Sequence, residues 1–455
     1  MQGVRIMRIT IWMVILTIGI CIPLYGLEEF PIRTSEMQLL YPKVSGSIVV
    51  WKEEYNDGIV KQGIFGCDLS DMVRFPICLG TSVTNAPDLD NDIVVWQDIR
   101  NENSDIYGYR LSTGEEFPIC TDSFDQTMPV ISGNMVVWCD NRNGIENTDI
   151  YGYNLITGQE FVICSEAGNQ TGPAISGNIV VWKDYRNDAG SGTNGDIYGY
   201  NLLESRELVI CINSLDQNSP AISGNHVVWF DKRSGSTHIY AFNLFTKQEI
   251  PLITTSSFKS YLAISGDNVI WSDLGSNARD ILGYNISESE AFPICTNSAD
   301  QVLPDINGYT VIWKDARDPL RQNIYGTYIP GPVAQLTMQV NALEGDPHTV
   351  TPQKGIHSYA KNEVVSIRAE RFVDCPYVYR FDHWEGDVAN PNSALTTIIM
   401  DSDKTVTAIF MDDRVCGDEC HPYLTGDLNW DCEINLVDMS ILANNWLGCT
   451  KPECD

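Results

Sequence analysis

Residues 174–211 contain the clearest copy of a repeat that runs through most of the chain. It reads AISGNIVVWKDYRN at 174–187, DIYGYNL at 196–202 and ELVIC at 207–211. Similar text surrounds seven tryptophans, which follow one another at intervals of 45, 42, 44, 47, 42 and 42 residues: Trp51, Trp96, Trp138, Trp182, Trp229, Trp271 and Trp313. A period of about 40–45 residues is typical of the four-stranded blades of a β-propeller.

Each repeat divides into four short strands separated by turn residues. Typical stretches, in order, are PAIS (173–176), NIVVW (178–182), DIYGYN (196–201) and EFPIC (116–120). The second strand is apolar throughout, which predicts burial on both faces between neighbouring blades. The proline of the fourth strand predicts an outer edge strand, because proline cannot donate a hydrogen bond to a neighbouring strand.

The two ends of the repeat region predict how the ring closes. The last repeat stops after Ile324-Tyr325-Gly326 without a fourth strand, whereas residues 30–34 read FPIRT, which is a fourth strand. We therefore expect the N-terminal strand to complete the last of seven blades, in an all-β propeller over residues 27–330. A linear solenoid is the alternative, but it leaves residues 30–34 unexplained, and closure removes exposed sheet edges.

The repeats resemble the TolB-like family of bacterial β-propellers, especially surface-protein repeats that read ISGNxVVWxDxRN…DIYGYNL. The resemblance covers about residues 30–328. It implies the propeller fold without fixing the blade number, because TolB itself has fewer blades. It does not specify a function, because propellers serve as receptors, lyases and hydrolases alike.

Polar residues recur at fixed positions of the repeat, and we interpret them as structural. A group that most blades carry serves something that each blade needs, and a buried or loop carboxylate usually needs a partner. One series pairs an aspartate with an arginine two residues later: Asp98/Arg100, Asp140/Arg142, Asp184/Arg186, Asp231/Arg233 and Asp315/Arg317. The other is a glutamine three residues before a proline: Gln126, Gln170, Gln217 and Gln301.

The loops between second and third strands are the expected ligand-contacting surface. Residues 186–195 form the longest of them, with an ordinary solvated loop as the alternative. The sequence contains no GxSxG, HExxH or phosphate-loop motif, and His226 and His238 have no nucleophile motif beside them. Carboxylates are so numerous that no pair stands out as an acid/base couple.

Length and charge restrict the class of protein. The 455 residues are enough for about two to four domains. The formal net charge of −31 disfavours nucleic acid and anionic lipid as partners, because both repel an acidic surface. Acidic side chains also supply oxygen ligands for calcium.

Residues 1–26 read as a secretory signal peptide. Arg5 and Arg8 precede an uncharged apolar run, Ile9–Ile20, and Pro23 and Gly26 follow it. The run is short for a membrane span, so an uncleaved anchor is the minor alternative, and bulky Ile20 makes the following cysteine a weak lipid-attachment site. We expect a secreted or cell-surface protein with no membrane insertion after signal cleavage.

The fourteen cysteines fall largely into two groups. Five recur at one position of the repeat, too far apart to bridge, and are expected to be buried and unpaired: Cys78, Cys120, Cys164, Cys211 and Cys295. Five others crowd into the C-terminal tail: Cys416, Cys420, Cys432, Cys449 and Cys454. In an exported chain these suggest disulfides, with a zinc site as the alternative.

A second, mainly β module is expected over residues 335–411, after the stiff linker IPGP at 329–332. Alternating strands are indicated at 337–340, 364–369 and 404–410. The stretches VTP (350–352), FDHWEGD (381–387) and MDSDKTVTAIF (400–410) resemble the divergent internalin B-type bacterial repeat, a small domain of secreted and surface-attached proteins. Trp384 could stack on a sugar, but the core is the more common place for tryptophan.

The tail, residues 416–455, contains a calcium-loop pattern. The order of side chains matches an EF-type loop, with Asp427, Asn429, Asp431, Glu433, Asn435 and Asp438 at positions 1, 3, 5, 7, 9 and 12. Met439, Leu442, Ala443 and Trp446 then follow at helical spacing. An Asp/Asn-rich turn without metal is the alternative.

The tail resembles one half of a type I dockerin, which implies calcium binding and a cohesin-like partner. Three departures argue against ordinary cohesin docking. Cys432 takes the usual glycine position, Leu436 and Val437 replace small polar recognition residues, and no second loop follows.

Together these features favour a non-catalytic secreted binding or scaffolding protein. The propeller would recognise an extracellular protein or glycan, and the tail would attach the protein to a complex or to the cell surface. The alternative is an extracellular propeller enzyme that degrades polysaccharide, either a lyase or a glycoside hydrolase. A group of charged or aromatic residues that breaks the repeat would discriminate between these functions.

Overall fold

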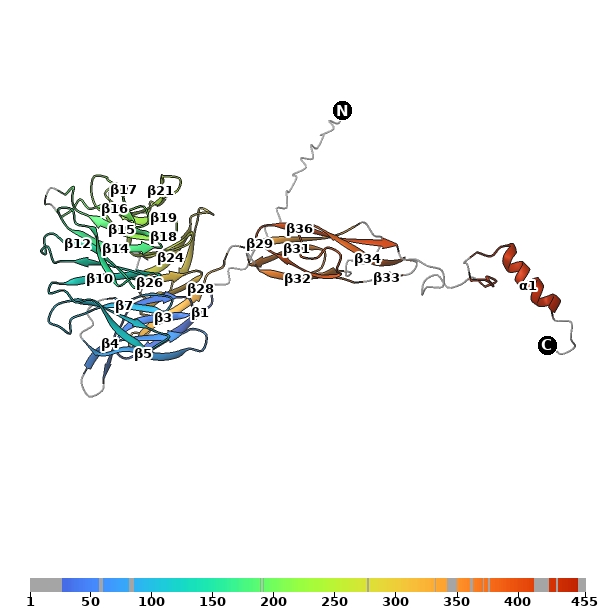
Figure 1. The fold of residues 1–455 in the computed structure, drawn as a ribbon, viewed down its shortest axis with the longest axis horizontal. Coiled ribbons are helices and arrows are strands. Elements are labelled where there is room, and N and C mark those ends of the chain that lie inside the picture. Colours follow the sequence, from blue (N-terminus) through green and yellow to red (C-terminus); the bar gives the residue numbers. More distant parts are fainter. Residues whose placement is uncertain are drawn as a thin grey trace, which may run out of the picture. The chain divides into compact units, whose positions relative to one another are not determined.

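The computed structural model describes residues 27–56, 60–81, 86–188, 190, 192–275, 278–331, 333–341, 350–360, 363–370, 372–374, 377–412, 425–430 and 433–448. The chain divides into two compact units, Met1–Ile329 and Pro330–Asp455. The regular structure of the described residues is nearly all β-strand, with one helix (Figure 1). No helix in these ranges is long and apolar enough to cross a membrane. The proposed signal segment and the five tail cysteines lie outside the described residues.

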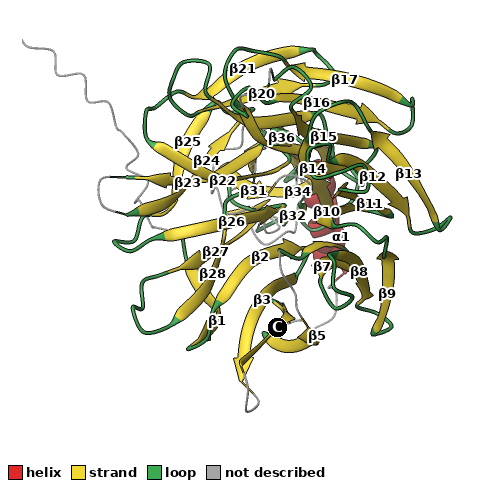
Figure 2. Cartoon of the chain, turned by 90° about the vertical axis from the view of Figure 1, so that its left-hand side faces the viewer, coloured by secondary structure: helices red, strands yellow, loops and turns green. Residues whose placement is uncertain are grey.

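The first unit contains seven four-stranded antiparallel sheets within its described part, arranged around a common centre (Figure 2). We call these sheets blades 1 to 7. The first strands, nearest the centre, are β2 (Leu39–Ser45), β6 (Asp88–Asp90), β10 (Gln126–Ser132), β14 (Gln170–Ser176), β18 (Gln217–Ser223), β22 (Phe258–Ser265) and β26 (Gln301–Asn307). The second strands are β3 (Ile48–Asn56), β7 (Ile93–Asp98), β11 (Met135–Asp140), β15 (Ile179–Asp184), β19 (His226–Asp231), β23 (Asn268–Leu274) and β27 (Thr310–Asp315).

The third and fourth strands complete each blade outward. The third strands are β4 (Val60–Asp68), β8 (Asp105–Arg110), β12 (Asp149–Asn154), β16 (Asp196–Asn201), β20 (His238–Asn243), β24 (Arg279–Asn285) and β28 (Gln322–Tyr328). The fourth strands of blades 1 to 6 are β5 (Val73–Thr81), β9 (Glu115–Cys120), β13 (Gln159–Cys164), β17 (Arg206–Cys211), β21 (Gln248–Ile253) and β25 (Glu290–Cys295). The fourth strands are outermost, as predicted, and those of blades 1, 2, 5 and 6 carry the expected proline.

Blade 7 takes its fourth strand from the N-terminal side of the chain. Strand β1 (Glu29–Ser35) pairs antiparallel with β28, with Phe30 opposite Gly326 and Thr34 opposite Asn323. The sheet order is β1-β28-β27-β26. The pairing predicted for residues 30–34 is therefore confirmed.

Hydrogen bonds between blades run right around the ring. The last side chain of each first strand accepts the N–H of a turn residue in the next blade. The seven donor–acceptor pairs are Asn91–Ser45, Gly133–Asp90, Gly177–Ser132, Gly224–Ser176, Gly266–Ser223, Gly308–Ser265 and Gly46–Asn307, at 2.6–3.1 Å. The last pair joins blade 7 to blade 1, so the ring is closed and no solenoid end remains.

The hydrophobic core lies between the blades. The second strands are almost fully buried, as their apolar sequence predicts, and the seven repeat tryptophans are at most 1 % exposed. Each tryptophan packs against the preceding blade: Trp138, for example, lies in one cluster with Ile93 and Val95. Burial of a large apolar side chain stabilises by roughly 1.5–3 kcal/mol, so these layers supply much of the driving force.

A glycine in the third strand makes room for an aromatic ring of the fourth strand. A Cβ built on Gly283 would lie 2.5 Å from the ring of Phe292, and one on Gly108 would lie 2.7 Å from Phe117. Blade 5 departs at both positions at once, with Ala241 opposite Ile250. The smaller isoleucine leaves room for the methyl group, so the two positions are coupled by packing.

We predict that Gly283→Ala destabilises the propeller by about 1–3 kcal/mol through overpacking. The double variant Gly283→Ala/Phe292→Ile copies the blade 5 pair and should recover most of that loss. Urea denaturation of the single and double variants gives the coupling energy. Additive effects of the two substitutions would contradict this packing.

The repeat cysteines are unbridged and buried, as predicted. Burial raises the pKa of the thiols of Cys120, Cys164 and Cys295 to about 12. Because the thiolate is the reactive form, these side chains should be unreactive at neutral pH. Thiol labelling followed by mass spectrometry should leave the five repeat cysteines unmodified in the native chain and label them in denaturant. Rapid native labelling of any of them would show that its blade opens.

The second unit contains two small sheets and one helix in its described residues. The sheets have the orders β31-β29-β36-β34-β33 and β30-β32-β35. Their strands are β29 (Val333–Val340), β30 (Val350–Thr351), β31 (Gly355–Ala360), β32 (Val364–Ala369), β33 (Phe372–Asp374), β34 (Tyr377–Glu385), β35 (Leu395–Ile399) and β36 (Lys404–Asp412). Helix α1 spans Leu436–Gly448.

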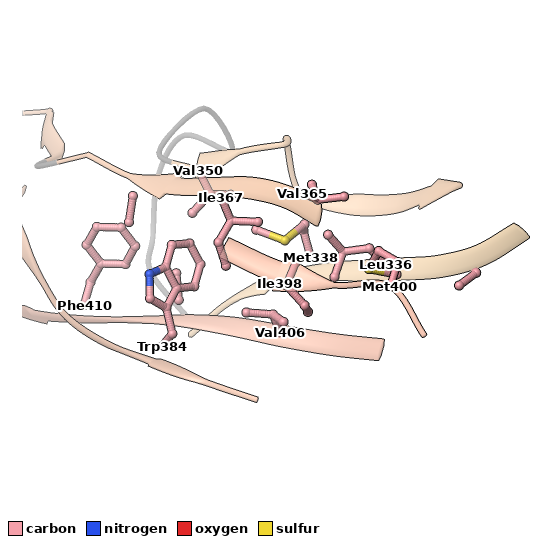
Figure 3. Packing of buried hydrophobic residues seen from close by; sticks show 13 residues of the cluster. Leu336, Met338, Val350, Val365, Ile367, Trp384, Ile398, Met400, Val406 and Phe410 are labelled. Atoms are coloured by element: carbon pink, nitrogen blue, oxygen red, sulfur yellow. The ribbon is translucent and has the colours of Figure 1, made fainter. Parts of the chain in front are cut away.

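One hydrophobic cluster joins the two sheets of this unit. Figure 3 shows its side chains between the strands, with Ile367 and Ile398 from one sheet and Met338, Val406 and Phe410 from the other. Trp384 belongs to the cluster: it is 2 % exposed, and its Nε1 donates to the carbonyl oxygen of Ser393 at 2.9 Å. Trp384 is therefore a core residue.

Candidate functional site

The repeated aspartates hold their blades together. In every blade the tryptophan Nε1 donates to a carboxylate two residues later, at 2.8–3.2 Å, and this carboxylate is Glu53 in blade 1 and an aspartate in the others. In five blades an arginine closes the arrangement. In blade 4, Arg186 donates to Asp184 at 2.8 Å and to Glu207 of the outer strand at 2.9 Å.

The same arginines also contact the tyrosine and the cysteine that recur in the repeat. The guanidinium of Arg142 stacks over the ring of Tyr151 at 4.1 Å and donates to the sulfur of Cys120, which belongs to the preceding blade, at 3.7 Å. A hydrogen bond to Asp140 raises the pKa of Arg142, so the charge is retained. The Asp-x-Arg series is therefore structural, as predicted, and leaves no free catalytic carboxylate at these positions.

The glutamine series is also structural. Gln126, Gln170, Gln217 and Gln301 are fully buried. Each Nε2 donates to a backbone carbonyl oxygen two residues earlier, for example to that of Leu215 at 2.8 Å. In blade 6, Lys259 stands in this position and donates to the carbonyl oxygens of Thr255 and Ser257. These side chains hold the backbone just before the first strand of their blades.

The central channel carries a charged group that breaks the repeat. The first strands line a cavity of about 340 Å³. At the residue after the proline position, blades 3 to 6 carry Val130, Ala174, Ala221 and Ala263, whereas the neighbouring blades 7, 1 and 2 carry Asp305, Lys43 and Asp88. We call Asp305, Lys43 and Asp88 the channel triad.

The triad is held by direct contacts. Lys43 Nζ lies 3.2 Å from Asp305 Oδ1 and 4.0 Å from Asp88 Oδ1. The other oxygens of the two aspartates accept the backbone N–H groups of Val44 and Ile131, each at 2.8 Å. At this position the channel therefore has one charged side, formed by three adjacent blades, and one side of valine and alanine.

The charges of the triad are strongly coupled. Attraction to Asp305 raises the pKa of Lys43 despite the opposing effect of burial, so the amine stays protonated. Burial raises the pKa of Asp88, although Lys43 and the N–H of Ile131 act in the opposite direction. The triad carries one positive and two negative charges when fully ionised, and it presents both hydrogen-bond donors and acceptors to the cavity.

In the loop predicted to contact ligand, the carboxylate of Asp188 binds the backbone of the same loop. Asp188 accepts the N–H groups of Gly190, Gly192 and Asn194 at 2.7–3.2 Å, which folds the loop on itself. Residues 189 and 191 lie outside the described residues. The two histidines of blade 5 have local partners: His226 contacts Asn243 and Asp267, and His238 contacts Ser234.

The structure describes part of the predicted calcium loop. Asp427 and Asp438 are buried, and Asp438 accepts the N–H groups of Leu428 at 2.6 Å and Asn435 at 2.9 Å. The start of the loop thus meets the start of α1, as positions 1 and 12 of a calcium loop must. Asp431 and Cys432 lie outside the described residues. No group of three His, Cys, Asp or Glu side chains gathers as a metal site in the described ranges.

Asp438 also has a structural role that needs no metal. Asn435 accepts the N–H of Val437 at 2.8 Å, and Asp438 accepts that of Asn435, which is a capping box at the start of the helix. These backbone N–H groups, that of Asn435 first, hold the pKa of Asp438 below its usual range. Met439 and Leu442, expected on the apolar side of the helix, are exposed. The donor set of Asp427, Asn429 and Asp438 is made of hard oxygens and fits calcium.

Comparison of the sequence finds no matching family model and no matching curated protein. Comparison of the structure finds β-propellers. The propeller domain of the trilobed protease from Pyrococcus furiosus matches 64 % of this chain over 95 % of its own, with a TM-score of 0.53 and 12 % identity. Oligogalacturonate lyase from Vibrio parahaemolyticus matches 67 % of this chain over 94 % of its own, with a TM-score of 0.51 and 13 % identity.

TolB from Acinetobacter baumannii is also among the matches, at 18 % identity, with 48 % of this chain, 55 % of TolB and a TM-score of 0.37. The Pyrococcus domain is described as having an open velcro topology, whereas β1 pairs with β28 in this chain. At these identities the matches establish the fold and leave the activity open. The first unit of this chain is a β-propeller with the fold found in a protease domain and in a lyase.

Proposed function

We propose that this chain is a secreted or cell-surface binding or scaffolding protein whose propeller recognises an extracellular glycan or protein without transforming it. The observation that carries the proposal is the channel triad. It is the place where charged side chains break the repeat in three neighbouring blades and line a cavity. A cavity of about 300–1,000 Å³ with a few convergent polar groups is typical of a ligand site.

The chemistry of the triad favours binding over catalysis. A lysine held by Asp305 stays an ammonium and cannot serve as a base or nucleophile at neutral pH. Both aspartates also accept a backbone N–H, which fixes their positions. Fixed donors and acceptors at the end of a channel suit recognition of hydroxyl or charged groups on a ligand.

A glycan-binding array combined with a reducing-sugar release assay tests this proposal on the full chain. We expect retention of a glycan without release of sugar. The matched variant is Lys43→Ala/Asp88→Ala/Asp305→Ala, which gives blades 7, 1 and 2 the residue that blades 4 to 6 already carry and should therefore fold. Its binding should be lost, whereas Ala221→Ser on the opposite side of the channel should retain it.

Release of reducing or unsaturated sugars that depends on the triad would contradict the proposal. It would favour the alternative function, a polysaccharide lyase or glycoside hydrolase. Binding that is unchanged in the triple variant would place the recognition surface elsewhere on the propeller.

The tail would attach the protein through calcium-dependent structure. Asp427, Asn429, Asp431 and Asp438 would supply side-chain oxygens, Glu433 its backbone carbonyl and Asn435 a water-mediated contact. Bound calcium would stiffen the loop before α1. The exposed Met439 and Leu442 would then be presented to a partner, for which a cohesin-like protein is the weaker candidate.

We predict one calcium ion fewer per chain in Asp427→Ala than in the wild-type protein, measured by isothermal titration calorimetry. The full chain is acidic and can bind further ions weakly, so the comparison between variants carries the result. Asp401→Ala, which removes an exposed acid of the neighbouring β module, is the matched control and should bind as the wild type does. Equal stoichiometry in all three proteins would contradict the calcium site.

A further inference from the structure

Blade 4 departs from the repeat along its outer edge. The departure concerns three positions, one before the fourth strand, one within it and one after it. Leu203, in the turn before the fourth strand, replaces Ser70, Ser112 and Ser287 of blades 1, 2 and 6, whereas blades 3 and 5 have Ile156 and Phe245 there. Val209 replaces Pro76, Pro118, Pro251, Pro293 and Pro31. Ile212, just after the strand, replaces Thr121, Ser165, Thr254, Thr296 and Thr34, and blade 1 has Leu79 there. Blade 4 alone has large apolar residues at all three positions.

These three side chains face solvent. Leu203 is 80 % exposed, Val209 57 % and Ile212 54 %. Leu203 precedes β17, Val209 lies in it and Ile212 follows it, and β17 is the free edge of its sheet. Exposed apolar residues scattered singly are ordinary, but blade 4 has three along one free edge. At the same positions blade 3 has two, Ile156 and Val162, and no other blade has more than one besides proline.

The backbone of this edge is also open. Val209 pairs with Tyr198 in the same register in which Pro118 pairs with Tyr107 and Pro293 with Leu282. Since proline is accepted there, the sheet itself does not need an N–H at this position. The N–H of Val209 therefore points outward, where proline would have removed it.

A groove lies beside the strand. Leu208 stands where five blades have phenylalanine, and it lines a groove of about 200 Å³ between blades 4 and 5. Leu208, Ile210, Phe242 and Leu244 supply its apolar lining. An apolar side chain brought in by a neighbouring strand would have a place to pack.

The charges along β17 are neutralised within the chain. Glu207 is held by Arg186 at 2.9 Å, and Arg206 pairs with Glu204 at 2.9 Å. Lys247 adds a cation at the groove. On a chain with a formal charge of −31, this edge is a place where a second acidic molecule can approach without facing unpaired carboxylates.

We propose that β17 pairs antiparallel with β17 of a second copy of this chain, forming a two-fold dimer. A proline in an outer strand blocks pairing with another copy, and blade 4 lacks this block while offering an apolar edge. The edge is self-complementary: with Val209 opposite Glu207 of the second copy, the turn that contains Leu203 in each molecule lies at the end of β17 that is followed by Ile212 in the other. A two-fold contact of this kind closes on itself and does not propagate.

Sedimentation velocity of the full chain over a range of concentrations tests the dimer. We expect a monomer–dimer equilibrium in the wild type and at least about ten-fold weaker association in Val209→Pro. Because five blades carry proline at this register, the variant should fold, which its melting temperature checks. The matched control is Val162→Pro in blade 3, where the edge lacks the apolar residue after the strand, and it should dimerise like the wild type.

A second pair of variants and the salt dependence strengthen the test. Leu203→Ser and Ile212→Thr insert the residues of other blades and should each weaken the dimer, whereas Phe245→Ser in blade 5 should not. Added salt should tighten the dimer, because it screens the repulsion between two acidic chains. A wild type that stays monomeric at high concentration, or a Val209→Pro variant that stays dimeric, would overturn the proposal. So would capture of another protein's extended segment at this edge by a monomeric chain.

Discussion

Deleting residues 27–36 is expected to lower the stability of the propeller more than any other change considered. The deletion removes β1 and bares the edge of β28. It also removes Leu27 and Ile32 from the interfaces on the two sides of blade 7 and breaks the pairs Arg317–Glu29 and Arg33–Glu53, both at 2.6 Å. We expect a loss of more than about 5 kcal/mol, which corresponds to a fall in melting temperature of more than about 10 °C.

A circular permutant separates closure from mere loss of residues. In it, residues 27–36 follow Ile329 through one of the third-to-fourth-strand turns of the chain, so that the strand returns to the same place by another connection. This permutant should melt close to the wild type by differential scanning calorimetry. A deletion variant as stable as the wild type would show that β1 does not hold the ring closed.

The second large effect is expected from the buried aspartate of a blade. Asp184 is fully buried and accepts hydrogen bonds from Trp182 Nε1, the backbone N–H of Arg186 and the Arg186 guanidinium, all at 2.8 Å. Asp184→Ala leaves the indole N–H and a partly buried guanidinium without this acceptor. Breaking one side of such a buried pair costs about 3–5 kcal/mol.

Urea denaturation of Asp184→Ala, Asp184→Asn and Glu204→Ala measures this effect. The asparagine variant keeps an acceptor oxygen and should lose less stability than the alanine variant. Glu204→Ala removes one partner of an exposed ion pair and should cost less than about 1 kcal/mol. Equal losses in Asp184→Ala and Glu204→Ala would mean that the repeated network does not stabilise the blade.

The repetition of the sequence made most of the fold predictable. The four strands have similar sequences from blade to blade. The fourth strand missing after Gly326 could therefore be matched to residues 30–34, and β1 pairs as expected. The structural reading of Asp140 and Arg142 also followed from repetition. A pattern that returns in most blades cannot mark a single catalytic site.

The channel triad could not be read from local sequence for a geometric reason. Lys43 and Asp305 are 262 residues apart and meet only because blade 7 closes against blade 1. Each lies alone in an ordinary first strand. The signal was present, however, in the residue after the proline: valine or alanine in blades 3 to 6 and a charged residue in blades 7, 1 and 2. Aligning the repeats position by position would have found it.

The ring of hydrogen bonds between blades shows the same limit. The Ser-Gly-Asn stretch of blades 3, 4 and 5 forms a tight turn after the first strand. Its serine also accepts an N–H from the turn of the next blade, as Ser132 does from Gly177. That second role depends on how neighbouring blades are set side by side, which no single repeat encodes.

The chemical fate of a ligand bound to the propeller decides most directly between binding and catalysis. A glycan retained by the full chain would be eluted after prolonged incubation and analysed by mass spectrometry, beside a sample incubated with Lys43→Ala/Asp88→Ala/Asp305→Ala. We predict that the wild type returns the glycan intact and that the triple variant retains none. Recovery of shortened or unsaturated products from the wild type, absent with the triple variant, would contradict the account and identify the channel as an active site.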